Sequence, residues 1–256
     1  MSEPITIRAS AERLVVAATM GPTIHDVHAW RFKVVPGLIE VHADPVRYRP
    51  TRDPAGRGLH LSSGAALVNL RLAAAQLGHE AVVRLLPDPG RPSVLASVRL
   101  AGRHRTTREE RLLYAATLRP FAAGRTGLRA RPSASLVNEL REAVALEGAA
   151  LHLLPTAQGA APQPAVLTSY GDSPAEWVRA GQALQRLLLS GTVRGVSVSF
   201  RFNVDVPGAE DMTRPGEVPQ VHIELAQDVD ARRLLQPPVA RQHEGQGRRQ
   251  RVGQPL

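Results

Sequence analysis

The stretch SGAALVNLRLAAAQLG, residues 63–78, decides the fold of this chain, because much of its pattern returns 117 residues later. Its leucines recur at helical spacing and a glycine closes the run, so we predict a helix over residues 63–77. A second predicted helix, over residues 173–190, shares the pattern at one constant offset. The coinciding positions are Gly64, Ala66, Leu67, Leu70, Leu72 and Gly78 in the first copy, and Gly181, Ala183, Leu184, Leu187, Leu189 and Gly195 in the second.

This coincidence predicts an internal duplication. Small residues near the start of both helices would allow their backbones to approach closely, as expected where equivalent helices cross at a pseudo-twofold interface. The alternative is two unrelated amphipathic helices that share an Ala- and Leu-rich composition.

Other predicted elements surround each long helix. The first half should contain a helix from Ser10, strands at Trp30–Val35 and Leu38–Ala43, and strands over residues 81–86 and 94–100. A further helix is expected over residues 107–116. The second half should contain a helix over residues 135–147 and strands over residues 150–154, 165–168, 196–202 and 220–225. Residues 155–164 contain three prolines and are the expected internal linker.

Composition limits the classes of function. The chain has 256 residues, 43% of them hydrophobic, and no cysteine, which excludes disulfides, thiolate metal sites and cysteine nucleophiles. The sequence has no apolar run of about eighteen residues and no signal-peptide pattern at its start, so we expect a cytoplasmic location.

The charge is basic and unevenly placed. Lys and Arg exceed Asp and Glu by 32 to 23, and residues 241–256 form an Arg-, Gln- and Gly-rich tail that we predict to be disordered. Aromatic residues make up 4%, which disfavours the stacking platforms of proteins that read single-stranded nucleic acid, so nucleic acid is not an expected partner. Nonspecific attraction to polyanions stays open.

The segment TIHDVHAWRF, residues 23–32, joins the first predicted helix to the first strand. It resembles a loop of the nitroreductase-like flavoproteins of the Acg type, which reads Pro-Ser-x-His-Asn-x-Gln-Pro-Trp-Arg. The resemblance continues, in the same order along most of the chain, through residues 53–57, 63–79, 141–154, 166–184 and 206–207. An ordered series of this length is more specific than any single motif.

The resemblance implies an α+β nitroreductase-like fold, with a mixed or antiparallel sheet flanked by helices and an internal pseudo-twofold repeat. Such proteins look like a nitroreductase dimer fused into one chain, with a first half at residues 1–118, a shortened second half at residues 119–240 and the tail beyond. It also implies bound FMN, with NAD(P)H as the reductant and a small molecule as the acceptor. The residues expected at the flavin are Thr23, His25, Asp26, His28, Arg119, Arg125, Arg232 and Arg233.

The presumed flavin loop departs from the family pattern where side chains should meet the ring. Thr23, Asp26, His28 and Ala29 replace the Ser, Asn, Gln and Pro of the motif. An ionised aspartate only accepts hydrogen bonds, so Asp26 cannot donate to a flavin carbonyl as asparagine would. The alternative function is therefore a degenerate, non-catalytic member that acts as a binding or pathway accessory protein.

Two smaller motifs give weaker indications of a metal site or a nucleophile. His25, Asp26 and His28 could begin a metal site, but no further cluster of ligands accompanies them, and ordinary polar loop residues are the better interpretation. Ser62 and Ser63 lack the Gly-x-Ser-x-Gly pattern of a nucleophile and are expected to cap a helix.

The shortened second half predicts a homodimer. A half that lacks strands would leave apolar surface uncovered, and a second copy of the same chain could cover it through one closed twofold interface. Residues 165–168 and the helix over residues 173–190 are expected near that interface.

Overall fold

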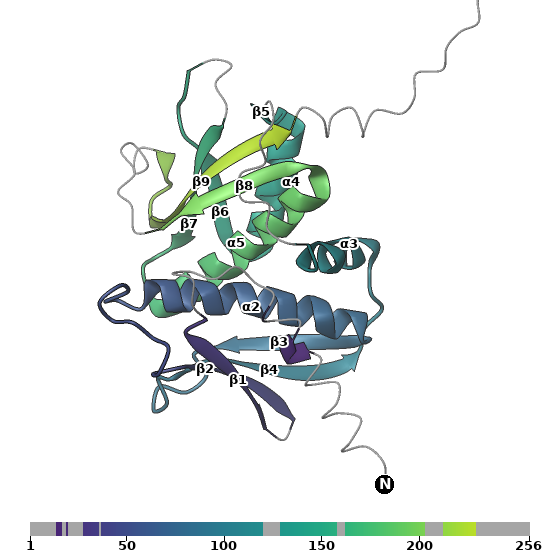
Figure 1. Cartoon of the computed structure of the whole chain (residues 1–256), viewed down its shortest axis with the longest axis vertical. Helices are drawn as coiled ribbons and strands as arrows, with labels where there is room; N and C mark the ends of the chain where they lie inside the picture. Colours follow the sequence, from purple (N-terminus) through teal and green to yellow (C-terminus); the bar gives the residue numbers. More distant parts are fainter. Residues whose placement is uncertain are drawn as a thin grey trace, which may run out of the picture.

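Two antiparallel sheets enclose two long helices that pack against each other (Figure 1). This computed structural model describes residues 14–16, 19, 28–35, 37–119, 129–157, 162–202 and 212–228. The arrangement confirms the α+β class with antiparallel sheets flanked by helices. In the described residues, no helix is both long enough and apolar enough to cross a membrane.

Sheet A belongs to the first half. Its strands are β1 (Trp30–Val35), β2 (Leu38–Ala43), β3 (His79–Leu85) and β4 (Val94–Arg103), in the order β1-β2-β4-β3. Helix α2 (Arg57–Gln76) covers one face, because apolar side chains alternate along the strands and bury residues such as Ile39, Val41 and Val98 against it. On the opposite face, side chains such as Lys33, Arg84 and Arg99 are exposed.

Sheet B belongs to the second half. Its strands are β5 (Arg129–Ala130), β6 (Ala149–Leu153), β7 (Gln163–Tyr170), β8 (Val196–Arg201) and β9 (Glu217–Asp228). The order β6-β7-β9-β8 matches that of sheet A strand for strand, with β5 added along β9. The described residues of sheet B thus contain the same four-stranded pattern as sheet A, and the shortening of this half relative to the family stays a prediction.

Two helices cover sheet B, and a third packs against the two long helices. Helices α4 (Ala134–Ala145) and α5 (Pro174–Arg194) bury apolar residues against it, and α3 (Arg108–Thr117) packs beside α2 and α5. The strand segment 165–168 and most of α5 are buried by the chain itself. They are not an exposed interface, so the homodimer stays a prediction whose contact surface must lie elsewhere.

Helices α2 and α5 cross at two glycines. A Cβ added to Gly64 would lie 2.1 Å from the carbonyl oxygen of Val178, and one added to Gly181 would lie 2.0 Å from that of Leu61. Leu61 and Val178 are separated by the same offset as the two glycines, so each contact is the counterpart of the other. The small residues that the sequence predicts at the crossing are confirmed there.

Two described helices start at their predicted capping signals, while the start predicted at Ser10 lies outside the described residues. Ser173 caps α5, and Thr107 with Glu110 forms the predicted capping box of α3. Helix α2, however, begins six residues before the prediction, at Arg57. Its N-cap position is Gly56, whose positive φ of 74° a side chain would oppose, and the capping carboxylate comes from further upstream.

Candidate functional site

The amino-terminal ends of α2 and α5 lie at the same end of the helix pair. Gly64 meets the first turns of α5, Asn69 accepts a hydrogen bond of 2.8 Å from Gln185, and Leu72 shares a core cluster with Leu189. Contacts that advance together along both chains mean that the helices run in the same direction. Two segments of the family resemblance, residues 53–57 and 171–177, therefore meet at this end.

Asp53 holds the start of α2. Its buried carboxylate accepts hydrogen bonds from the backbone N–H groups of Gly58, at 3.1 Å, and Leu59, at 2.9 Å. The hydroxyl of Tyr48 donates to the carbonyl of Asp53, and burial and the nearby Asp53 raise the pKa of that phenol. The Asp-Pro-x-Gly-Arg motif is thus explained by the cap that it builds.

Asp172 links the two halves by hydrogen bonds at the amino-terminal ends of α2 and α5. It accepts hydrogen bonds from Arg57 at 2.5 Å, from the indole N–H of Trp177 at 2.6 Å and from Gln220 at 3.4 Å. The Arg57 guanidinium also lies over the Trp177 ring, 5.3 Å from its centroid. His60 meets the same ring edge-on, with centroids 5.6 Å apart. His60 and Trp177 occupy equivalent positions of the two long helices.

The surroundings of His60 disfavour its protonated form. Its Nδ1 lies 2.6 Å from the carbonyl oxygen of Gly56, and because a carbonyl only accepts, Nδ1 carries the hydrogen. Burial lowers the pKa of His60, although the Gly56 contact and Asp53 act in the opposite direction. Burial and the charge of Arg47 likewise lower the pKa of His28.

A pH dependence of stability follows from the lowered histidine pKa values. In the unfolded chain these histidines bind protons below a pH of about 6.5, whereas in the folded chain their lowered pKa values delay protonation. The free energy of unfolding should therefore fall as the pH drops through this range. We expect the free energy of unfolding of His60→Gln to decrease less than that of the parent chain between about pH 7.5 and about pH 5.5. His28 should cause part of the decrease that is left in the variant. Urea unfolding at both pH values measures this, and an undiminished fall in the variant would contradict it.

Most residues expected at a flavin lie outside the described part of the chain. These are Thr23, His25, Asp26, Arg125, Arg232 and Arg233. Of the other two, Arg119 follows α3 and is exposed. His28 precedes β1 and meets the Trp30 ring edge-on, with centroids 4.8 Å apart. Within the described residues the structure shows no contact that joins His28 to Arg119.

Two buried nitrogen atoms at the start of β1 have no hydrogen-bond partner among the described residues. They are Nδ1 of His28 and the indole Nε1 of Trp30. An unpaired buried donor is costly, and a ligand with a polar edge would satisfy it. The Nδ1 atom of His28 is therefore a buried polar atom that a ligand could reach with a complementary polar group.

The structure also tests part of the predictions for the two smaller motifs. The described residues contain no group of three His, Asp or Glu side chains placed to hold a metal, while His25 and Asp26 lie outside them. Ser62 and Ser63 lie inside α2, where their hydroxyls donate to the carbonyls of Leu59, at 3.0 Å, and His60, at 2.8 Å. The prediction that they cap a helix is wrong, because α2 starts earlier.

A second polar cluster, which the sequence did not reveal, lies between the helices away from this end. The buried carboxylate of Glu147 accepts hydrogen bonds from Arg71 at 2.7 Å, Gln182 at 3.2 Å and Arg186 at 3.4 Å. A small cavity of about 180 Å³ borders the cluster; it is lined by Val68, Arg71, Leu72, Thr107, Glu109, Glu110 and Arg186. Residues from three separate segments meet here, so no local motif could signal it.

Comparison with known proteins gives a partial match. The chain is similar to two proteins of Mycobacterium tuberculosis, from strains CDC 1551 / Oshkosh and H37Rv, each named "Putative NAD(P)H nitroreductase". Identity is 36% over 85 residues, or 33% of this chain, and the chain spans 25% of the length of these relatives. No family model matches the chain. The match supports the nitroreductase-like relation that the motifs predict.

Proposed function

We propose that this chain is an FMN-binding, nitroreductase-like oxidoreductase or flavin-sequestering protein of the Acg type, with NAD(P)H as the reductant if it turns over. The observation that carries the proposal is the similarity to proteins named as NAD(P)H nitroreductases. The α+β fold with antiparallel sheets is consistent with it.

The proposal includes an internal duplication of residues 1–118 in residues 119–240. Matching strand orders in sheets A and B support it, as do the counterpart contacts of Gly64 and Gly181. In such a fused pair, a ligand between the halves would need residues from only one chain.

The flavin-binding residues remain those expected from the family resemblance. His28 would offer its unpaired Nδ1 to the ring edge, beside Thr23, His25 and Asp26. Arg119, Arg125, Arg232 and Arg233 would bind the ribityl chain and phosphate, since guanidinium groups bind phosphate through paired hydrogen bonds. Bound FMN supplies hydride transfer, so the side chains need only bind, orient and exclude water.

The second candidate function is a non-catalytic accessory protein. It is favoured by the loss of the amide pair at Asp26 and His28, because a carboxylate and an imidazole do not present the donors and acceptors of Asn and Gln. Flavin binding separates the two functions.

We expect the purified protein to show flavin absorption, or to quench the fluorescence of added FMN. The double variant Asp26→Asn with His28→Gln should bind FMN about tenfold more tightly, because an amide donor is restored and a carboxylate charge leaves the ring edge. Fluorescence titration with FMN measures both.

The matched control is Asp88→Asn with His79→Gln, which makes the same chemical changes at the start of β3 and in the loop after it, and should leave FMN affinity unchanged. A colourless protein that does not bind added FMN would favour the accessory function. Unchanged affinity in the Asp26 and His28 double variant would show that these positions do not meet the flavin.

A further inference from the structure

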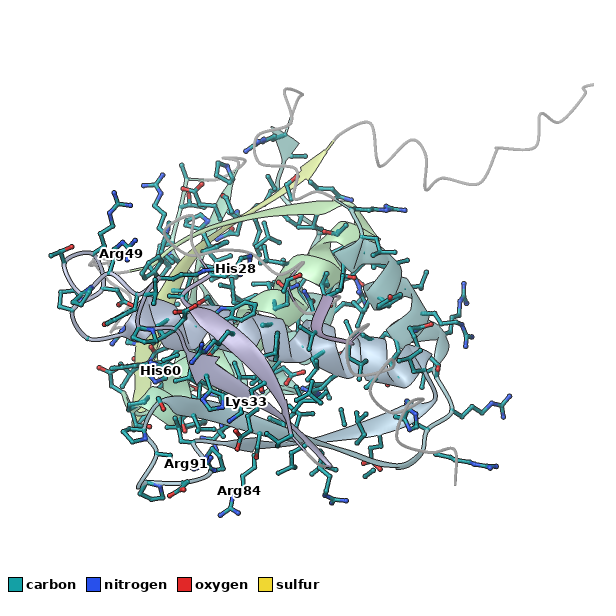
Figure 2. All side chains as sticks on the ribbon, turned by 60° about the horizontal axis from the view of Figure 1, so that its bottom comes forward. His28, Lys33, Arg49, His60, Arg84 and Arg91 are labelled. Carbon is teal, nitrogen blue, oxygen red and sulfur yellow. The ribbon has the colours of Figure 1, made fainter. Side chains whose placement is uncertain are left out.

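The outer faces of the two sheets differ in what covers them. On sheet B, Val166 and Thr168 point away from α5 and are nevertheless completely buried, and the Glu217 carboxylate lies in the same layer, 2.6 Å from His152. The corresponding face of sheet A, which we call the open face, carries exposed charged side chains. Figure 2 brings this face forward and shows Lys33, Arg84 and Arg91 along it.

The open face of sheet A carries four exposed cations, Arg31 and Lys33 on β1, Arg84 on β3 and Arg99 on β4. Within the part of the chain that the structure describes, none of the four forms an ion pair. Unpaired cations keep their full attraction for an external anion.

Two of the three carboxylates on or beside this face are already engaged. Glu40 is 5% exposed and lies 2.8 Å from His42 and 3.2 Å from Arg91. The hydrogen bond from His42, and then the Arg91 charge, lower the pKa of Glu40 against the effect of burial. Asp88 pairs with Arg91 at 2.9 Å. Glu80 is exposed, near the start of β3, so the face keeps an excess of positive charge.

Strand register fixes the spacing of these cations. Lys33 is opposite Glu40, Glu40 is opposite Ser97, and Ser97 is opposite Arg84, so Lys33 and Arg84 end one row across the sheet. Three strand spacings separate them by about 14 Å, and Arg31 lies about 7 Å from Lys33 along β1. The row is close to the major-groove width of duplex DNA, about 12 Å, so cations on β1 and β3 could reach phosphates on both sides of a groove.

We propose that the open face of sheet A binds the phosphate backbone of double-stranded nucleic acid without sequence preference. No aromatic side chain from β1 to β4 lies on this face, since Trp30 and Phe32 pack into the core, so base stacking and membrane insertion lack their usual anchors. The side chains here are cations that position a backbone, and they include no amide to read base edges.

The test compares two charge-matched double variants of the full chain. Lys33→Gln with Arg84→Gln removes two cations from the face, whereas Arg108→Gln with Arg214→Gln removes two exposed cations from α3 and from the loop before β9. The probe is a fluorescein-labelled duplex of about 24 base pairs and mixed sequence, followed by anisotropy at salt concentrations from about 50 to about 200 mM.

We expect the face variant to bind about tenfold more weakly at the lower salt and to lose about two units of the slope of log affinity against log salt. The control variant should keep most of the affinity of the parent chain. Equal losses in both variants would overturn the proposal, because they would show that net charge alone governs binding.

Two further experiments test whether another part of the chain binds the duplex, or whether the face binds a membrane instead. Replacing Arg248, Arg249 and Arg251 with Gln tests the basic tail, and loss of binding in that variant with none in the face variant would overturn the proposal. Vesicles of phosphatidylcholine and phosphatidylserine test a membrane surface. Binding to vesicles but not to the duplex would also overturn it. Circular dichroism confirms that each variant is folded.

Discussion

Replacing Gly64 with alanine should lower the free energy of unfolding by about 3 kcal/mol or more, and replacing Gly181 should do the same. A methyl group at either position would lie about 2 Å from a backbone carbonyl oxygen of the other helix. Backbone cannot rotate out of the way as the end of a flexible side chain can. The helices would have to separate, which would open the core on both sides of the crossing.

Urea unfolding followed by circular dichroism measures this loss. The matched control is Gly90→Ala in the loop between β3 and β4, where the nearest atom to a new Cβ is a carboxylate oxygen of Asp88 at 3.2 Å. That side chain can move, so the control should change stability by less than about 1 kcal/mol. An unchanged urea midpoint for Gly64→Ala would show that the helices do not cross as described.

The double variant Gly64→Ala with Gly181→Ala should lose less free energy of unfolding than the sum of the losses in the two single variants. Both methyl groups are accommodated by the same separation of α2 and α5, so the second clash is relieved by the movement that the first requires. Independent contacts would instead give additive losses.

Removing the Glu147 carboxylate should also have a large effect. We expect Glu147→Ala to destabilise the chain by about 3 kcal/mol, because it leaves the guanidinium groups of Arg71 and Arg186 without their shared buried partner. Gln182 loses an acceptor at the same time. The control, Glu142→Ala, removes an exposed carboxylate from α4 and should cost less than about 1 kcal/mol.

Thermal and urea unfolding at low and high salt test the origin of this loss. A buried network is screened little by salt, so the difference between Glu147→Ala and the parent chain should persist at about 1 M salt. A loss that disappears at high salt would mean that the pairs behave as surface ion pairs.

The long helices were predictable because their signals are local. Ser173 and Pro174 mark the start of α5, and the glycine and leucine pattern marks the shared crossing. The start of α2 was missed because its capping carboxylate, Asp53, reaches the helix from four residues before its first residue. A rule that looks for a capping side chain at the N-cap position finds only Gly56.

The polar contacts between the halves could not be predicted from sequence. Asp172 and Arg57 are 115 positions apart, and Glu147 meets Arg71 from 76 positions away. Nothing in the neighbourhood of either acid specifies its distant partner, because the contact depends on how the helices pack. The segment of residues 23–32 was recognised through its resemblance to a family, and six of the eight residues expected at a flavin lie outside the described part of the chain.

The edge-on contact of His60 with Trp177 gives the proposed duplication an evolutionary consequence. In a dimer of identical subunits, every substitution appears twice, so equivalent positions that touch across the axis must hold the same residue. A fused chain lifts this restriction. One copy can then acquire a buried imidazole while the other acquires an indole, and each partner can adapt to the other one mutation at a time.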